Sequence, residues 1–149
     1  MASDPYRKIS ELSAKDCAVV QFEVDVGLGL WSVQLNFRGK DRKHVEAFAI
    51  HPRTLDGLIT TRISSKELSM LDALLKTCRS TRGVNPRESI YPWRKMRMKV
   101  SWIADEIIER KEEFSISNPT HLSDRQLGFM SNLCVRVISE LRSRADRTT

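Results

Sequence analysis

The stretch with the greatest capacity for chemistry is YPWRKMRMKVSWIADEIIERKEEF, residues 91–114, in which four cations fall within six residues between two tryptophans. Clustered Lys and Arg side chains neutralise phosphates, and an exposed indole stacks on a nucleic-acid base or anchors a protein partner. The charge turns acidic from Asp105 onward. These residue types point to a binding surface rather than to a catalytic group.

The same stretch has the apolar spacing of a helix from about residue 92 to residue 114. At about 100° per residue, one side of this helix collects a core stripe of Trp93, Met96, Val100, Ile103 and Ile107. Met98 and Trp102 project away from the stripe and lie four residues apart, so they can touch each other. We expect them to form a small exposed patch beside the cations. The alternative is that a second helix covers Trp102 and that Lys and Arg stems lie over its ring.

Positive charge is concentrated in one segment. Residues 61–100 contain ten cations and three anions, a net charge of +7, whereas the whole chain carries +6. A localised basic region is the electrostatic footprint of a polyanion binder, although it also suits a solvated face. The first functional hypothesis is therefore a nucleic-acid-binding regulatory or accessory protein that contacts mainly backbone phosphate. Its predicted contact residues are Arg94, Lys95, Arg97, Lys99, Trp102, Lys40, Arg42, Lys43, Arg79, Arg82 and Arg87.

The second hypothesis is a protein-interaction module or a homodimeric adaptor. The last predicted helix has a broad apolar stripe from Leu127 to Leu141, and Phe129 lies well off this stripe on the helical wheel. A partner helix or a second copy would bury it. The predicted interaction residues are Phe129, Met98 and Val135.

Several kinds of enzyme site lack their motifs. The three histidines show no HExxH or metal-ligand spacing, and GLGLW, residues 27–31, lacks the third glycine of a dinucleotide fingerprint. Glu23 and Asp25 share the polar face of a predicted strand, which favours solvated charges over a catalytic pair. The three cysteines are far apart and read as core thiols. We therefore predict no catalytic residue, no metal and no cofactor, and expect a non-enzymatic protein.

The elements that must position these residues follow from hydrophobic periodicity. Apolar side chains alternate with polar ones over residues 20–26 and 31–38, which predicts an antiparallel hairpin with one apolar face. Residues 45–50 form a third predicted strand, and residues 58–63 leave a fourth strand open. Helical spacing is expected over residues 5–14, from the capping box SSKE at 64–67 to Gly83, over 92–114, and again from Ser123 or Asp124.

The predicted fold class is α+β: a short N-terminal helix, an antiparallel sheet of three or four strands, and three helices on one sheet face. The length of 149 residues suits a single globular domain over 1–149, with residues 1–4 and 143–149 expected to fray. No stretch is apolar enough to cross a bilayer, and the start lacks the apolar run of a secretory signal. We therefore expect an intracellular protein that makes no membrane contact.

Overall fold

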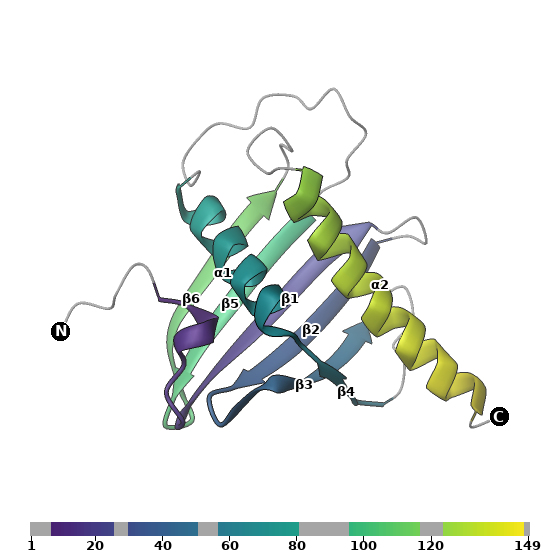
Figure 1. The fold of residues 1–149 in the computed structure, drawn as a ribbon, viewed down its shortest axis with the longest axis horizontal. Helices are drawn as coiled ribbons and strands as arrows, with labels where there is room; N and C mark the ends of the chain where they lie inside the picture. Colours follow the sequence, from purple (N-terminus) through teal and green to yellow (C-terminus); the bar gives the residue numbers. More distant parts are fainter. Residues whose placement is uncertain (1–6, 26–29, 51–56, 81–95, 117–123, 148–149) are drawn as a thin grey trace.

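The computed structural model describes residues 7–25, 30–50, 57–80, 96–116 and 124–147. A short 3-10 helix, η1 (Ile9–Glu11), precedes four strands: β1 (Asp16–Asp25), β2 (Leu30–Arg38), β3 (Asp41–Ile50) and β4 (Ile59–Arg62). Helix α1 (Ser65–Ser80), strands β5 (Met96–Ala104) and β6 (Ile107–Ile116), and helix α2 (Asp124–Arg147) follow. The chain is therefore α+β, with a sheet layer and a helix layer (Figure 1).

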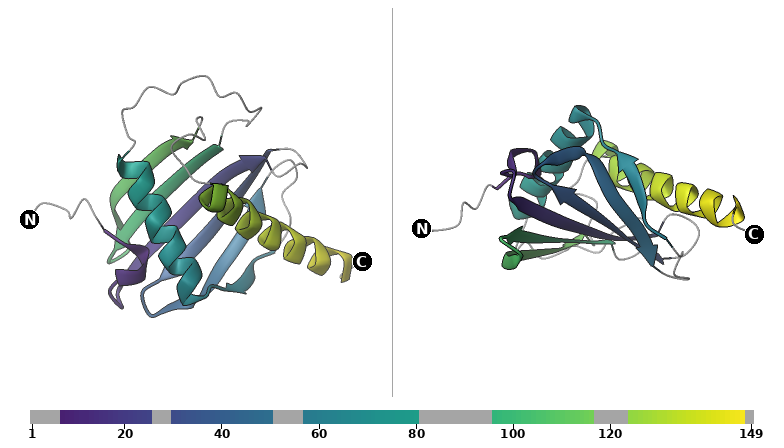
Figure 2. Two further views of the ribbon diagram at one scale, coloured as in Figure 1. Left: turned by 45° about the horizontal axis from the view of Figure 1, so that its top comes forward. Right: turned by 90° about the horizontal axis from the view of Figure 1, so that it is seen from below.

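All six strands form one antiparallel sheet in the order β4-β3-β2-β1-β5-β6. Strand β1 lies inside the sheet, where it pairs with β2 along one edge and with β5 along the other. Both α-helices pack on the same face of the sheet (Figure 2). Alternation along β1 sends Val20 and Phe22 into the interior, at 0% exposure, and turns Gln21 to the opposite, half-exposed face.

The prediction of a helix over residues 92–114 is wrong, and with it the predicted sheet of three or four strands and the count of three helices. Residues 96–116 form the β5–β6 hairpin. Its turn is Asp105–Glu106, and both residues have positive φ, 49° and 64°. Such a turn usually carries Asn-Gly, so the sequence gives little sign of it. Met98, Val100 and Trp102 then alternate into the core, a period-two pattern that the helical spacing had obscured.

The N-terminal helix predicted over residues 5–14 is also shorter than expected. Of the described residues 7–14, only Ile9–Glu11 are helical, and they form a single 3-10 turn. Its Ile9 is fully buried, and the Ile9 amide donates to Asp72 Oδ1 at 2.8 Å, which ties η1 to α1. Residues 1–4 lie outside the described ranges, whereas α2 continues to Arg147.

The start of α1 agrees with its predicted capping box. Ser64 Oγ accepts a hydrogen bond from the Glu67 amide, and Glu67 Oε1 accepts one from the Ser64 amide, both at 3.1 Å. The buried face of α1 carries Leu68, Leu71, Leu74, Leu75 and Cys78. This stripe covers the sheet together with the apolar face of α2, and so the helix layer buries the apolar face of the strands.

Candidate functional site

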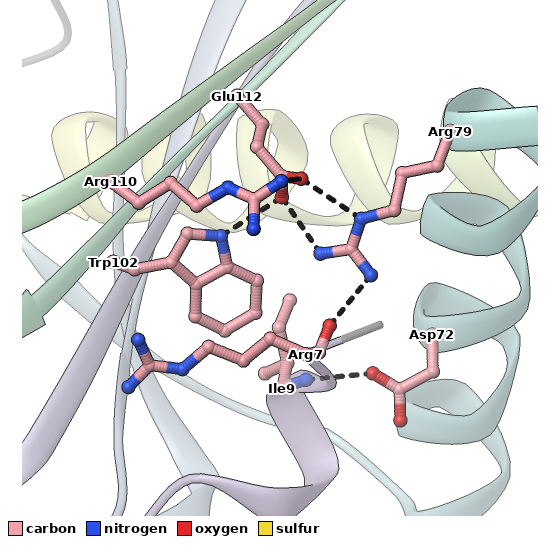
Figure 3. Close-up of polar contacts among 7 residues, drawn as sticks. All are labelled: Arg7, Ile9, Asp72, Arg79, Trp102, Arg110 and Glu112. Carbon is pink, nitrogen blue, oxygen red and sulfur yellow. Dashed lines mark hydrogen bonds and ion pairs between the residues drawn. The ribbon is translucent and has the colours of Figure 1, made fainter. Parts of the chain in front are cut away.

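Trp102 lies in the interior, so the exposed patch of Met98 and Trp102 that the nucleic-acid hypothesis needs is wrong. The residue is 0% exposed, and its indole Nε1 donates to Glu112 Oε2 at 3.0 Å. The guanidinium of Arg7 lies over the ring at 5.0 Å from its centroid (Figure 3). An indole enclosed in this way has no face available to a nucleic-acid base or to a partner protein. The tryptophan is covered, as the alternative held, but it lies on strand β5 rather than on a helix beneath a second helix.

Glu112 is the acceptor around which this cluster is built. Arg79 donates to both carboxylate oxygens, from Nε at 3.0 Å and from Nη2 at 2.7 Å. Arg110 Nη2 lies 3.0 Å from Oε1, and Trp102 supplies the fourth contact. The carboxylate is 1% exposed, and Arg79 Nη1 also donates to the Arg7 carbonyl at 2.8 Å. The cluster therefore joins α1, β5, β6 and the chain before η1 (Figure 3).

The electrostatics of Glu112 suit a structural role. Burial alone would raise the pKa of its carboxyl group. Hydrogen bonds from Arg79 and Trp102, with the positive charges of Arg79 and Arg110, outweigh that effect and hold the pKa below its ordinary value of 4.5. A carboxylate that is ionised, enclosed and engaged at both oxygens is poorly placed to exchange protons with a substrate. We interpret it as a clamp between secondary-structure elements.

Among the residues that the structure describes, the predicted nucleic-acid contacts do not form one surface. Arg79 belongs to the buried cluster, and Arg42 Nη1 donates to the Leu12 carbonyl at 2.7 Å. Arg97 and Lys99 alternate with buried residues of β5, so they lie on the sheet face away from the helices, where Lys99 is paired in register with Glu113. Lys40 is exposed in the β2–β3 turn, and Lys43 is exposed on β3. The remaining predicted contacts lie outside the described residues: Arg82, Arg87, Arg94 and Lys95.

The three predicted interaction residues are placed differently from one another. Met98 is 0% exposed inside the sheet–helix core, so its expected place on an outer patch is wrong. Phe129 is 9% exposed and packs against the core. Val135 is 41% exposed on α2. Phe129 nevertheless lines a groove between the two helices, where a small part of its side chain is accessible.

This groove runs between α1 and α2 and has a volume of about 540 Å³. The two helices run in opposite directions, and polar pairs join them at both ends. Glu67 Oε2 meets Arg136 Nη1 at 2.9 Å, and Gln126 Nε2 donates to Thr77 Oγ1 at 2.9 Å. Ten residues separate the two bridging positions on each helix, which corresponds to about 15 Å at 1.5 Å per residue. Along α2 the residues that line the groove run from Arg125 to Arg136, about three helical turns, whereas α1 contributes Glu67 and Met70.

The floor of the groove is apolar and one of its walls lacks a side chain. Met70, Phe129 and Leu133 supply apolar surface, and Gly128 lines the same hollow. A Cβ atom added to Gly128 would meet nothing within 4 Å. Glycine inside a helix costs about 0.5–1 kcal/mol relative to alanine. The described residues give no steric reason for glycine at this position. The absence of a side chain at Gly128 does, however, leave open space in the groove beside the α2 backbone.

A smaller hollow of about 300 Å³ continues past one end of the groove. Glu67 lines both spaces, and the smaller one is also lined by Lys43, Ser64 and Ser65 at the start of α1. Lys43 has the same strand parity as the buried Val45, so its side chain starts on the helix-covered side of the sheet. Sequence reasoning missed the whole groove, because its walls come from two helices whose spacing is set by tertiary packing. The interior glycine of α2 was the one available signal.

The chain matches no protein-family model, no curated protein and no solved structure. Among the described residues, no group of three or more potential metal ligands comes together. Within those same ranges, neither helix combines the length and the apolar character that a membrane span requires.

Proposed function

We propose that this protein is a protein-interaction module that binds an apolar helical segment of a partner in the groove between α1 and α2. The observation that carries the proposal is a groove with an apolar floor beside an interior helical glycine. A helix-in-groove complex places side chains at spacings of three and four residues into such a hollow. Glycine at 128 lets the partner approach the α2 backbone more closely than any other residue would.

The dimensions support a short segment. A length of about 15 Å corresponds to ten helical residues, so the partner would present anchors at positions i, i+3 or i+4, and i+7. Met70 on the floor adds an unbranched, adaptable side chain that suits a binding surface. An interface of this size belongs with transient complexes, and we expect a Kd on the order of micromolar.

Nucleic-acid binding, the first hypothesis from the sequence, is less well supported by this geometry. It relied on Trp102 and a shared cationic surface, and the indole is enclosed while Arg79 is engaged by Glu112. Lys43 of β3 starts from the helix-covered face of the sheet, whereas Arg97 and Lys99 of β5 start from the opposite face. On the part of the chain that the structure describes, a polyanion would therefore meet scattered charges rather than one strip.

The test is selection of helical peptides from a displayed library, followed by fluorescence anisotropy with the selected peptide. The decisive variant is Gly128→Leu, which fills the groove and also raises helix propensity. We expect it to abolish peptide binding while thermal stability stays equal or rises. Val135→Leu, on an exposed position of α2 that does not line the groove, should leave binding unchanged.

Two results would count against the proposal. One is a selection that enriches no helical peptide with micromolar affinity for the wild-type protein. The other is salt-sensitive binding of labelled RNA or DNA between about 50 and about 200 mM salt that Gly128→Leu leaves intact. That second result would return the assignment to nucleic-acid binding.

A further inference from the structure

We infer that the partner segment is acidic at both ends, and that a carboxylate at one end pairs with Arg125 and a carboxylate at the other end pairs with Lys43. This inference rests on the proposed function, because it specifies the chemistry of the segment that occupies the groove. It assigns roles to two cations, one at the far end of the groove and one in the neighbouring hollow that shares Glu67 with it, with the apolar floor between them.

Arg125 marks the first end. It is exposed, lines the groove, and precedes Gln126, which bridges to Thr77 on α1. Within the ranges that the structure describes, Arg125 forms no ion pair with a carboxylate, in contrast to Arg136 at the other end. A cation that lines a binding groove without an internal counter-charge is available to a carboxylate of the ligand.

Lys43 marks the second end, in the smaller hollow beyond Glu67. Glu67 itself does not make this end acidic, because its carboxylate is paired with Arg136 and accepts the Ser64 amide of the capping box. Lys43 makes no ion pair with any other described residue, and its side chain is exposed. Arg62 lines the same hollow and is exposed, so the net potential at this end is set by Lys43 and Arg62, while Glu67 and Arg136 offset each other.

Charge also decides between an acidic partner and a second copy of this chain. A copy that docked its own groove against this one would add a second Arg125 and a second Lys43 to the interface, and among the described residues the one carboxylate that lines the groove, Glu67, is already paired with Arg136. An acidic amphipathic helix matches both the apolar floor and the two cationic ends. We therefore expect the protein to be a monomer at micromolar concentration in sedimentation.

The probes are three acetylated 14-residue peptides that share a central ten-residue Leu/Ala amphipathic helix. They carry two glutamates, two glutamines or two lysines at each end. Exposed interfacial ion pairs are weak, so each cationic end should change Kd by about twofold to fivefold. We expect the glutamate peptide to bind about tenfold more tightly than the lysine peptide at low salt, with a difference that shrinks as salt is added.

The reciprocal variants make the test specific. The double variant Lys43→Glu/Arg125→Glu should reverse the order, so that the lysine peptide binds best. The matched control is Arg97→Glu/Lys111→Glu, which makes the same change in net charge at exposed positions of β5 and β6 that do not line the groove. It should preserve the preference for glutamate.

The outcomes separate this inference from the proposed function. Equal binding of all three peptides, each lost in Gly128→Leu, would overturn the inference and leave the groove as a binding site. A preference for lysine in the wild-type protein would do the same. Failure of every peptide to bind would overturn both proposals, as would a dimer that dissociates in Gly128→Leu, because the groove would then belong to a second copy.

Discussion

Replacing Glu112 by glutamine, which exchanges one carboxylate oxygen for an NH₂ group, should strongly lower the free energy of unfolding. The substitution keeps the shape of the side chain but puts an NH₂ group where one carboxylate oxygen accepted hydrogen bonds. That group would face donors from Arg79, Arg110 or Trp102. It also removes the negative charge that compensates two guanidinium groups in a site where the carboxylate is 1% exposed.

The magnitude follows from the burial of this pair. Removing one partner of a buried ion pair costs about 3–5 kcal/mol, because the remaining charge is left uncompensated. Domains are stable by about 5–15 kcal/mol in total, so the loss is a large fraction. At about 2–4 °C per kcal/mol for a chain of this length, the melting temperature should fall by roughly 10 °C. Urea unfolding followed by circular dichroism gives the same quantity independently.

Glu113→Gln is the matched control, since it makes the same chemical change at the next residue of β6. Glu113 is exposed on the opposite sheet face, in register with Lys99. Its loss should cost no more than about 1 kcal/mol, the upper range for an exposed pair. Equal destabilisation by the two variants, or a loss below about 1 kcal/mol for Glu112→Gln, would contradict the assignment of Glu112 as the clamp.

The effect of Glu112 should also depend on pH with a defined sign. Its pKa in the folded protein is lowered below the ordinary 4.5, so the unfolded chain takes up the proton first as pH falls. The contribution to stability is therefore complete above about pH 4.5 and declines as pH drops through the folded pKa. The difference in unfolding free energy between wild type and Glu112→Gln should shrink over that acidic range. A difference that grows on acidification would have the wrong sign for this account.

Three further predictions concern other parts of the fold. Gly39→Ala should lower the unfolding free energy by at least about 1–3 kcal/mol in urea, because the added Cβ would lie 1.6 Å from a backbone carbonyl oxygen; a neutral result would show that this turn can move aside. Glu106→Gly should raise the melting temperature, since φ is 64° there and glycine removes a strain of about 1 kcal/mol; a lower melting temperature would contradict that geometry. In a thiol-reagent titration near pH 8, Cys78 and Cys134 should stay unreactive until the chain unfolds, because burial raises the pKa of each to about 12, whereas half-buried Cys17 should react in the native state.

The sequence alone determined the elements whose hydrophobic period was unambiguous. Alternation along Val20–Val26 and Trp31–Phe37 predicted the first hairpin, and the capping box at Ser64 predicted the start of α1. The fourth strand, left open, pairs with β3. These features follow from side-chain order along a short segment, because the period of a strand or helix and the chemistry of a cap are local properties.

The segment from Met96 to Ile116 was decided by tertiary structure. Its apolar residues fit a helix through Val100 and Ile103, and they also fit a strand through Met98, Val100 and Trp102. Local sequence does not separate these alternatives, because the strand is stabilised by pairing with β1, about 80 residues earlier in the chain. The hairpin also gives the reversal of charge a reason, since Lys99 of β5 lies opposite Glu113 of β6.

The same distinction holds for the candidate site. The sequence showed a tryptophan close to a cluster of cations. It could not show that Arg7 and Glu112 would enclose the Trp102 side chain. Nor could it show the groove, whose apolar floor comes from two helices that meet only after both pack on the sheet. Hydrophobic periodicity and helix capping depend on residues that are neighbours in the sequence. The burial of a side chain and the shape of a groove depend on which distant parts of the chain pack together.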